Sequence, residues 1–295
     1  MQRLVRHLRQ DFRQHGAPAD RVAFVPQWML AANAGRLGHG LRHPDPLPTA
    51  SVLGAVGAMS IPAGPIRRRI ERIAGVSLMQ LYGHPFSSYT QKALTALYEN
   101  DTPFEFLNLS PDNPDIYAEF ARRWPIRKFP LLVDGDRQVM EATCIIEYLD
   151  VHYPGSTRLI PTDADAAVEV RLLDRFFDNY ISTPQQRIVY NQLRPETDRD
   201  PYGVNEARAA LGTGYAWLDQ HMAGREWAAG NAFSLADCAA APALFYADWT
   251  HRVDEKFRNV HAYRARLLKR PSFARCVEGG RPYRPLFPLG APDRD

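Results

Sequence analysis

The strongest constraint on the fold comes from residues 78–109, where two short apolar segments flank one helical segment. Residues 78–83 (LMQLYG) and 103–109 (PFEFLNL) have the length and composition of strands, and residues 89–100 (YTQKALTALYEN) those of a helix. A helix between two strands implies a parallel pair, because a tight hairpin joins only antiparallel neighbours. The chain is therefore expected to build an α/β unit here.

The next segments extend this unit. Residues 113–124 (NPDIYAEFARRW) predict a second helix, and residues 129–141 (FPLLVDGDRQVME) predict two strands around an Asp-Gly-Asp turn. Residues 141–153 (EATCIIEYLDVHY) place their apolar side chains on one helical face. The order βαβ and then ββα predicts a compact α/β domain at 79–153.

Segments with the composition of strands become rare beyond this domain. Residues 154–163 (PGSTRLIPTD) have the composition of a linker, and residues 164–285 predict an all-α domain, followed by a tail at 286–295. Ser234 and Asp237 have the spacing of a capping box. In this motif the serine side chain accepts from the backbone N–H of the acidic residue, and the acidic side chain accepts from the backbone N–H of the serine. They predict the start of a buried helix.

Residues 1–78 form a poorly patterned basic extension. They contain 11 Arg and four acidic residues, a net charge of +7, and are interrupted by Pro and Gly. An Arg-rich start with few acids is also typical of a targeting arm. We expect instead a disordered extension, or a mis-assigned start with true initiation at Met79.

Composition excludes several function classes. The whole chain has a net charge of +3, so the residues after 78 carry −4, which argues against nucleic-acid binding. No run reaches the roughly 18 apolar residues of a membrane span. The three cysteines lie far apart with no CxxC pair, which indicates a reducing, cytoplasmic setting. No metal-ligand spacing and no phosphate-binding glycine loop is present.

Four segments in order resemble the cytosolic glutathione S-transferase family. They are LYGHPFSSYTQKAL at 81–94, KFPLLVDGD at 128–136, MEATCIIEYLD at 140–150 and FSLADC at 233–238. The resemblance covers residues 79 to 285. It implies a thioredoxin-like N-terminal domain followed by an all-α helical-bundle C-terminal domain. It also implies glutathione as co-substrate, a small electrophilic second substrate, a homodimer and a role in detoxification, without a metal.

The resemblance assigns the corner at 83–90 to activation of the glutathione thiol. An ordinary thiol has a pKa of about 8.5, so the enzyme must stabilise the thiolate. A hydroxyl at a helix start suits this task, and Ser87 stands where the serine-using members place it. Ser88, Tyr82 and Tyr89 are the alternates, and Ser88 could instead cap the helix. His84 is expected to shape the loop.

The glutathione-binding residues are also implied by the resemblance. Phe129 would pair its backbone with the cysteinyl part across a cis bond to Pro130, and Lys128 would meet the glycine carboxylate. Glu141 would face the ammonium group, and the helix start at Ala142 would hold the α-carboxylate. Serine is usual at position 142, so Ala142 removes one hydroxyl donor unless Thr143 or a water replaces it.

The second substrate is expected between the domains. The candidate pocket residues are Phe177, Tyr180, Pro184, Tyr246 and Trp249. A glutathione-dependent isomerase, peroxidase or dehalogenase shares the first half of such a site and stays open. The loss of the hydroxyl at Ala142 also leaves open a non-catalytic binding or interaction module.

Overall fold

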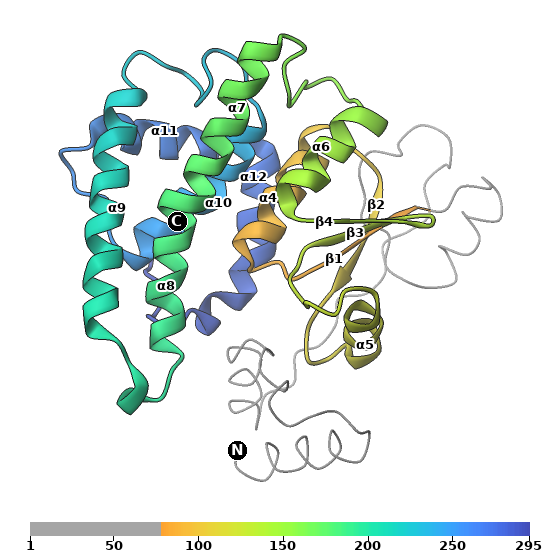
Figure 1. Ribbon diagram of the computed structural model, residues 1–295, viewed down its shortest axis with the longest axis horizontal. Coiled ribbons are helices and arrows are strands. Elements are labelled where there is room, and N and C mark those ends of the chain that lie inside the picture. Colours follow the sequence, from red (N-terminus) through yellow and green to blue (C-terminus); the bar gives the residue numbers. More distant parts are fainter. Residues whose placement is uncertain (1–77) are drawn as a thin grey trace, which may run out of the picture.

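The computed structural model describes residues 78–295, so the basic extension expected over 1–78 lies almost wholly outside the described residues. A sheet-containing half precedes a helical half (Figure 1). The first half contains β1 (Met79–Gly83), α4 (Ser88–Glu99), β2 (Phe104–Asn108), α5 (Pro114–Arg123), β3 (Leu131–Asp134), β4 (Arg137–Met140) and α6 (Ala142–His152). The second half contains α7 (Ala164–Phe176), η3 (Phe177–Ser182), α8 (Thr183–Gln192), η4 (Glu196–Asp198), α9 (Pro201–His221), α10 (Leu235–Thr250), α11 (Arg258–Lys269), α12 (Pro271–Gly280) and η5 (Arg281–Leu286).

The sheet has the order β2-β1-β3-β4. β1 is parallel to β2, with Leu81 opposite Phe106, and β3 is antiparallel to both β1 and β4. The turn between β3 and β4 contains Gly135 with a φ of 56°, a conformation that favours glycine. The predicted parallel pair and hairpin are both confirmed.

The two faces of the sheet bury different sets of side chains, because successive strand residues point to opposite faces. Leu81 and Leu132 join the large core, which continues without a break into helix α10 of the second half. Tyr82 and Leu131 point the other way and pack with Phe120 of α5 in a smaller core. Helices therefore cover both faces, α4 and α6 on one and α5 on the other (Figure 1).

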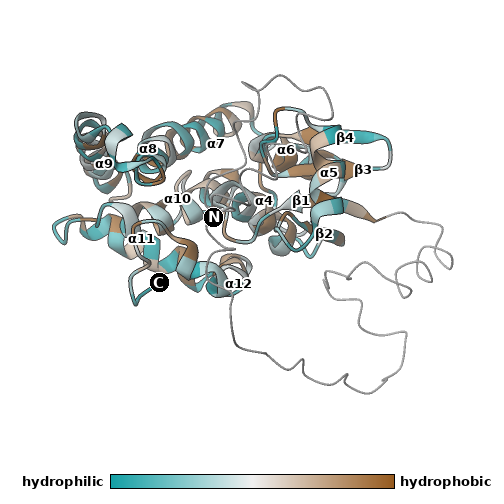
Figure 2. Ribbon diagram, turned by 90° about the horizontal axis from the view of Figure 1, so that it is seen from below, coloured by the Kyte–Doolittle hydropathy of each residue, from teal (hydrophilic) through white to brown (hydrophobic). Residues whose placement is uncertain are grey.

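Helix α10 lies at the centre of the second half (Figure 2). The predicted capping box is present at its start, where the Asp237 carboxylate accepts from the Ser234 backbone at 2.9 Å. Asp237 also accepts from the Ala228 backbone at 2.9 Å and from the Tyr263 hydroxyl at 2.5 Å. These bonds satisfy a buried carboxylate and fix the helix start.

A buried ion-pair cluster joins the two halves. Lys92 of α4 is 1% exposed. Its Nζ lies 2.6 Å from Asp174 Oδ1 of α7 and 2.9 Å from Asp178 Oδ2 of η3. Lys92 also donates to the Thr143 hydroxyl of α6 at 2.9 Å, and Arg175 pairs with both carboxylates from the outer side. The cluster therefore connects α4 and α6 of the first half with α7 and η3 of the second half.

Replacing Lys92 by Met is expected to lower the free energy of unfolding by about 3–5 kcal/mol, because two carboxylates stay buried without their central cation. Urea unfolding followed by circular dichroism measures this change. Lys269→Met, at an exposed position, is the matched control and should leave stability nearly unchanged. A loss of under about 1 kcal/mol for Lys92→Met would contradict the buried charge pairing.

Candidate active site

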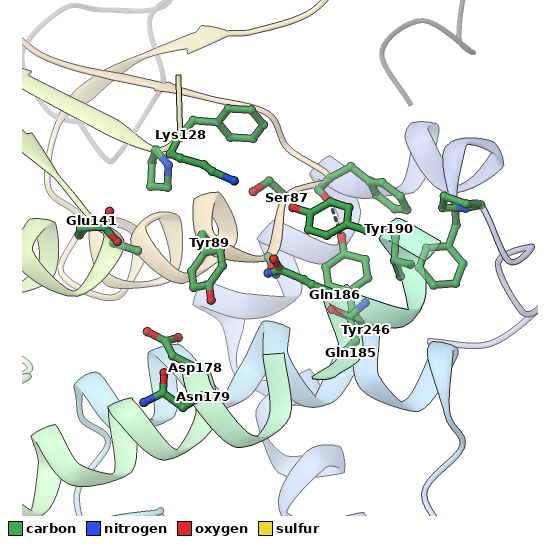
Figure 3. A pocket seen from close by; sticks show the side chains of 18 of the residues that line it. Ser87, Tyr89, Lys128, Glu141, Asp178, Asn179, Gln185, Gln186, Tyr190 and Tyr246 are labelled. Atoms are coloured by element: carbon green, nitrogen blue, oxygen red, sulfur yellow. Dashed lines mark hydrogen bonds between the residues drawn. The ribbon is translucent and has the colours of Figure 1, made fainter. Parts of the chain in front are cut away.

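A cavity of about 520 Å³ opens between the sheet-containing half and the helical half (Figure 3). Three separate segments of the first half line it, and α4 and α6 begin beside it. The residues from the first half are Phe86, Ser87, Ser88, Tyr89, Arg127, Lys128, Phe129, Pro130, Glu141 and Ala142. The residues from the second half are Arg175, Asp178, Asn179, Gln185, Gln186, Val189, Tyr190, Tyr246, Leu286, Phe287 and Pro288.

The corner between β1 and α4 places a hydroxyl at the helix start. Gly83 lies so close to Thr90 that an added Cβ would be 2.6 Å from the Thr90 methyl group, so only glycine fits here. Ser87 is the N-cap residue, and its Oγ accepts from the Thr90 backbone at 3.3 Å. The cap is thus Ser87 and not the alternative Ser88, which is the first helical residue. The Ser87 hydroxyl oxygen therefore accepts from the helix backbone, and the hydroxyl proton can still be donated to another group.

Tyr82 and Tyr89, the two tyrosines considered as alternatives to Ser87, differ in their position relative to the cavity. Tyr82 is 3% exposed, faces Phe120 with ring centroids 6.1 Å apart, and does not line the cavity. Tyr89 does line it, with its hydroxyl pointing towards Asp178 and Asn179 (Figure 3). Burial raises the pKa of Tyr89, and the nearby Asp178 carboxylate raises it further. Tyr89 therefore remains protonated at neutral pH.

The segment that immediately precedes β3 carries the next cavity residues. Lys128, Phe129 and Pro130 all line the cavity, and the Phe129–Pro130 peptide bond is cis, as the resemblance implies. Arg127 joins them with a φ of 57°, which is rare outside glycine. Sequence reasoning missed Arg127, and no local signal distinguishes it from a surface arginine.

The start of α6 also lines the cavity, on the same side as Lys128 (Figure 3). Glu141 has a φ of 65° and precedes the helix, while Ala142 begins it and is 4% exposed. The Thr143 hydroxyl donates to Asp174 at 2.8 Å and accepts from Lys92. Thr143 thus belongs to the ion-pair cluster and does not replace the hydroxyl that Ala142 lacks.

Of the five residues expected for the second-substrate pocket, only Tyr246 lines the cavity. Its hydroxyl donates to the Phe86 carbonyl at 3.0 Å and accepts from Gln91 at 3.1 Å. Phe177 is fully buried in the core, and Tyr180 is 61% exposed on the outer surface. Pro184 is buried in the first turn of α8, and Trp249 packs on Phe287 outside the cavity lining.

The reason for this difference is the π-helical segment η3 in the middle of an otherwise continuous helix. It brings Asp178 and Asn179 to the cavity instead of their aromatic neighbours. Gln185, Gln186, Val189 and Tyr190 follow on α8 and complete this side. In the sequence, the polar pair at 178–179 continues the same alternation of polar and apolar pairs as 174–175, so no local signal marks it as part of the site.

Residues 286–288 close one end of the cavity. Phe287 is 6% exposed and packs against Trp249 with ring centroids 5.4 Å apart. The predicted tail at 286–295 is therefore part of the site. Within residues 78–295, no group of three His, Cys, Asp or Glu is placed to hold a metal, and no helix there is long and apolar enough to cross a membrane.

Two family models match the chain. Residues 81–157 match the glutathione S-transferase N-terminal domain, and residues 201–266 match the glutathione S-transferase C-terminal domain. Glutathione S-transferase F6 of Arabidopsis thaliana is 26% identical over 204 residues, which cover 66% of this chain and 96% of that protein. A stringent starvation protein A homolog of Haemophilus ducreyi is 25% identical over 211 residues, covering 70% of this chain and 92% of that protein.

A solved structure is similar to the chain as well. The glutathione S-transferase of Methylobacillus flagellatus, determined with glutathione bound, has a TM-score of 0.62 and 26% sequence identity. The match covers 67% of this chain and 98% of that chain.

The buried His84 predicts a pH dependence of stability. It is 1% exposed, its Nδ1 accepts from the Phe86 backbone at 3.1 Å, and burial lowers its pKa to about 4. An unfolded His, with a pKa of about 6.5, binds more protons than the native one between these values, so stability falls as the pH falls. Between pH 7 and 5, His84 should contribute about 2 kcal/mol of this loss.

Urea unfolding of the native chain and of His84→Asn, at pH 7 and at pH 5, isolates this contribution. Other titrating groups affect both proteins alike, so the loss between the two pH values should be about 2 kcal/mol smaller in the variant. An equal loss in both proteins would show that His84 titrates normally.

Proposed function

The chain is a transferase of the glutathione S-transferase family, and from this premise we propose that it binds glutathione in the interdomain cavity and attacks an electrophilic carbon with the glutathione thiolate. The observation that carries this proposal is the convergence of three separate segments on one cavity. These are the capping hydroxyl of Ser87, the segment at Phe129–Pro130 before β3 and the start of α6 at Ala142.

Ser87 is the residue we assign to thiolate stabilisation. Lowering a thiol pKa by about two units requires about 2.7 kcal/mol. The N-terminus of α4 supplies typically about 0.3–1 kcal/mol. A hydroxyl that donates to the anion adds about 1.5–3 kcal/mol. The two effects together suffice, and Ser87 provides both because it caps the helix and retains its proton.

The remaining groups would position glutathione. The Phe129 backbone would pair with the cysteinyl part, and Lys128 would pair with the glycine carboxylate. The backbone N–H groups at Ala142 would hold the α-carboxylate, and Glu141 would pair with the ammonium group. The second substrate would then occupy the side lined by the helical half, and the protein would contribute positioning and electrostatics without a covalent intermediate.

A non-catalytic binding module is the second candidate function. Its support is Ala142, which lacks a hydroxyl that Thr143 does not replace. The thiolate measurement below separates the two, because a module that does not activate the thiol leaves its pKa near the ordinary value of about 8.5.

The proposal includes a homodimer. Apolar side chains are exposed on α6 and α7, where Val151 is 71%, Val168 63% and Leu172 60% exposed. Burying such a surface against a second copy would remove apolar area from water. The molar mass in solution, from sedimentation velocity, decides between one copy and two.

Replacing Ser87 by Ala is expected to raise the pKa of bound glutathione by about 1–2 units, because the hydrogen bond to the anion is lost. The ultraviolet absorbance of the thiolate, titrated against pH in the complex, measures this pKa. Ser88→Ala is the matched control and should leave the pKa unchanged. If Ser88→Ala raises the pKa and Ser87→Ala does not, the assignment passes to Ser88.

Replacing Ala142 by Ser is expected to tighten glutathione binding about 2–10-fold, because the new hydroxyl can donate to the α-carboxylate. Isothermal titration calorimetry measures the affinity. Ala142→Gly should not tighten binding, which separates the hydroxyl from an effect of side-chain size. Unchanged affinity in Ala142→Ser would show that this carboxylate lies elsewhere.

A further inference from the structure

The corner that leads into Ser87 is held by side chains from outside its own segment. The Tyr246 hydroxyl of α10 donates to the Phe86 carbonyl at 3.0 Å (Figure 3). The Gln91 amide of α4 donates to the Pro85 carbonyl at 2.9 Å and to the Tyr246 hydroxyl at 3.1 Å. Two side chains therefore bind the two consecutive carbonyl groups that precede Ser87.

The N–H groups of the same two peptide units are bonded as well. The Phe86 N–H donates to His84 Nδ1 at 3.1 Å, and the Ser87 N–H donates to the His84 carbonyl at 3.0 Å. The peptide unit between Pro85 and Phe86 is thus held at both ends, and so is the unit between Phe86 and Ser87. Because a peptide unit is planar, holding its two ends fixes its orientation. The direction in which the Ser87 side chain leaves the backbone follows from it.

Gln91 and Tyr246 lie where α4 packs against α10 and α12, and they are 1% and 4% exposed. The end of α12 leaves just enough space for them, because an added Cβ on Gly280 would lie 3.1 Å from Gln91 Nε2. Among the described residues, the Gln91 Oε1 atom has no hydrogen-bond partner, which is unfavourable in a core. The contribution of Gln91 therefore comes from its two N–H groups, whose bonds are strengthened by the absence of water.

The single proton of the Tyr246 hydroxyl is already used. It is donated to the Phe86 carbonyl, and the hydroxyl oxygen accepts from Gln91. Burial raises the pKa of Tyr246, so the hydroxyl is protonated at neutral pH. Although Tyr246 lines the cavity, its proton is not available to a thiolate or to a substrate. Any effect of this hydroxyl on the reaction must therefore pass through the corner.

We propose that Tyr246 and Gln91 are positioning residues, which orient the Ser87 hydroxyl towards the thiolate of bound glutathione. This inference rests on the proposed function, in which Ser87 stabilises that thiolate. The two side chains fix the backbone before Ser87, and the cap bond from the Thr90 N–H fixes the serine rotamer. A hydrogen bond weakens steeply when its donor points away, so a less firmly held serine stabilises the thiolate less. The helical half thereby contributes to thiol activation through α10.

The pKa of bound glutathione, from the ultraviolet absorbance of the thiolate, tests the proposal. Tyr246→Phe and Gln91→Met should each raise this pKa by about 0.5–1 unit, which lowers the thiolate fraction below the pKa about 3–10-fold. The affinity for S-methylglutathione, which has no thiol to ionise, should stay within about 2-fold and shows that the variants are folded. Tyr215→Phe is the matched control. The Tyr215 side chain is 1% exposed and donates to the His251 carbonyl at 3.0 Å, so the control loses a similar buried bond outside the corner.

A Ser87→Ala background shows whether the effect passes through Ser87. Tyr246→Phe should raise the thiol pKa no further once the serine hydroxyl is gone. An equal rise with and without Ser87 would overturn the proposal, and so would an equal rise in Tyr215→Phe. A thiol pKa near about 8.5 in the native complex would reject the proposed function itself. A low native pKa that neither Tyr246→Phe nor Gln91→Met changes would reject only the positioning role.

Discussion

The arrangement of the cavity depends on the buried ammonium group of Lys92. It lies between Asp174 and Asp178 of the helical half and is held in addition by Thr143 at the start of α6. An unpaired charge at this depth would be strongly unfavourable, so the pairing permits only one relative position of α4, α6 and α7. Ser87 caps the same helix that carries Lys92, and Asn179 follows Asp178. The ion pairs thus set the distance between the two sides of the site.

The π-helical segment η3 determines which side chains of the helical half face the cavity. Pro184 has no N–H to continue the α-helical bonding, and the Thr183 hydroxyl donates to the Asp178 carbonyl at 2.9 Å instead. Gly214 of α9 packs so closely that an added Cβ would lie 3.2 Å from the Tyr180 carbonyl. A wider turn in the middle of a helix changes which side chains face the cavity, as is frequent at functional sites. Here polar groups replace aromatic ones.

The elements of the fold could be predicted because their signals are local. The strand, helix and strand at 78–109, the hairpin at 134–137 and the capping box at Ser234 each depend on residues a few positions apart. Ser87 was also predictable as a cavity residue, since it lies at a strand-to-helix corner. Phe177 and Tyr180 were predicted to line the pocket, but neither does. Their apolar character indicated a ligand pocket, but apolar side chains serve a core or an outer surface equally well.

Local sequence patterns establish the order of the elements, the faces that they bury and the hydroxyl-rich corner, because periodicity and capping act within one segment. The side chains of the helical half that meet this corner are set by the packing of the helices in three dimensions. The reason is physical. The rotation of the α7–α8 helix about its axis depends on the π-helical turn η3 and on an ion pair between residues more than 80 positions apart in the sequence, Lys92 and Asp178. Polar Asn179 and Gln186 therefore reach the cavity, although nothing next to them in the sequence indicates it.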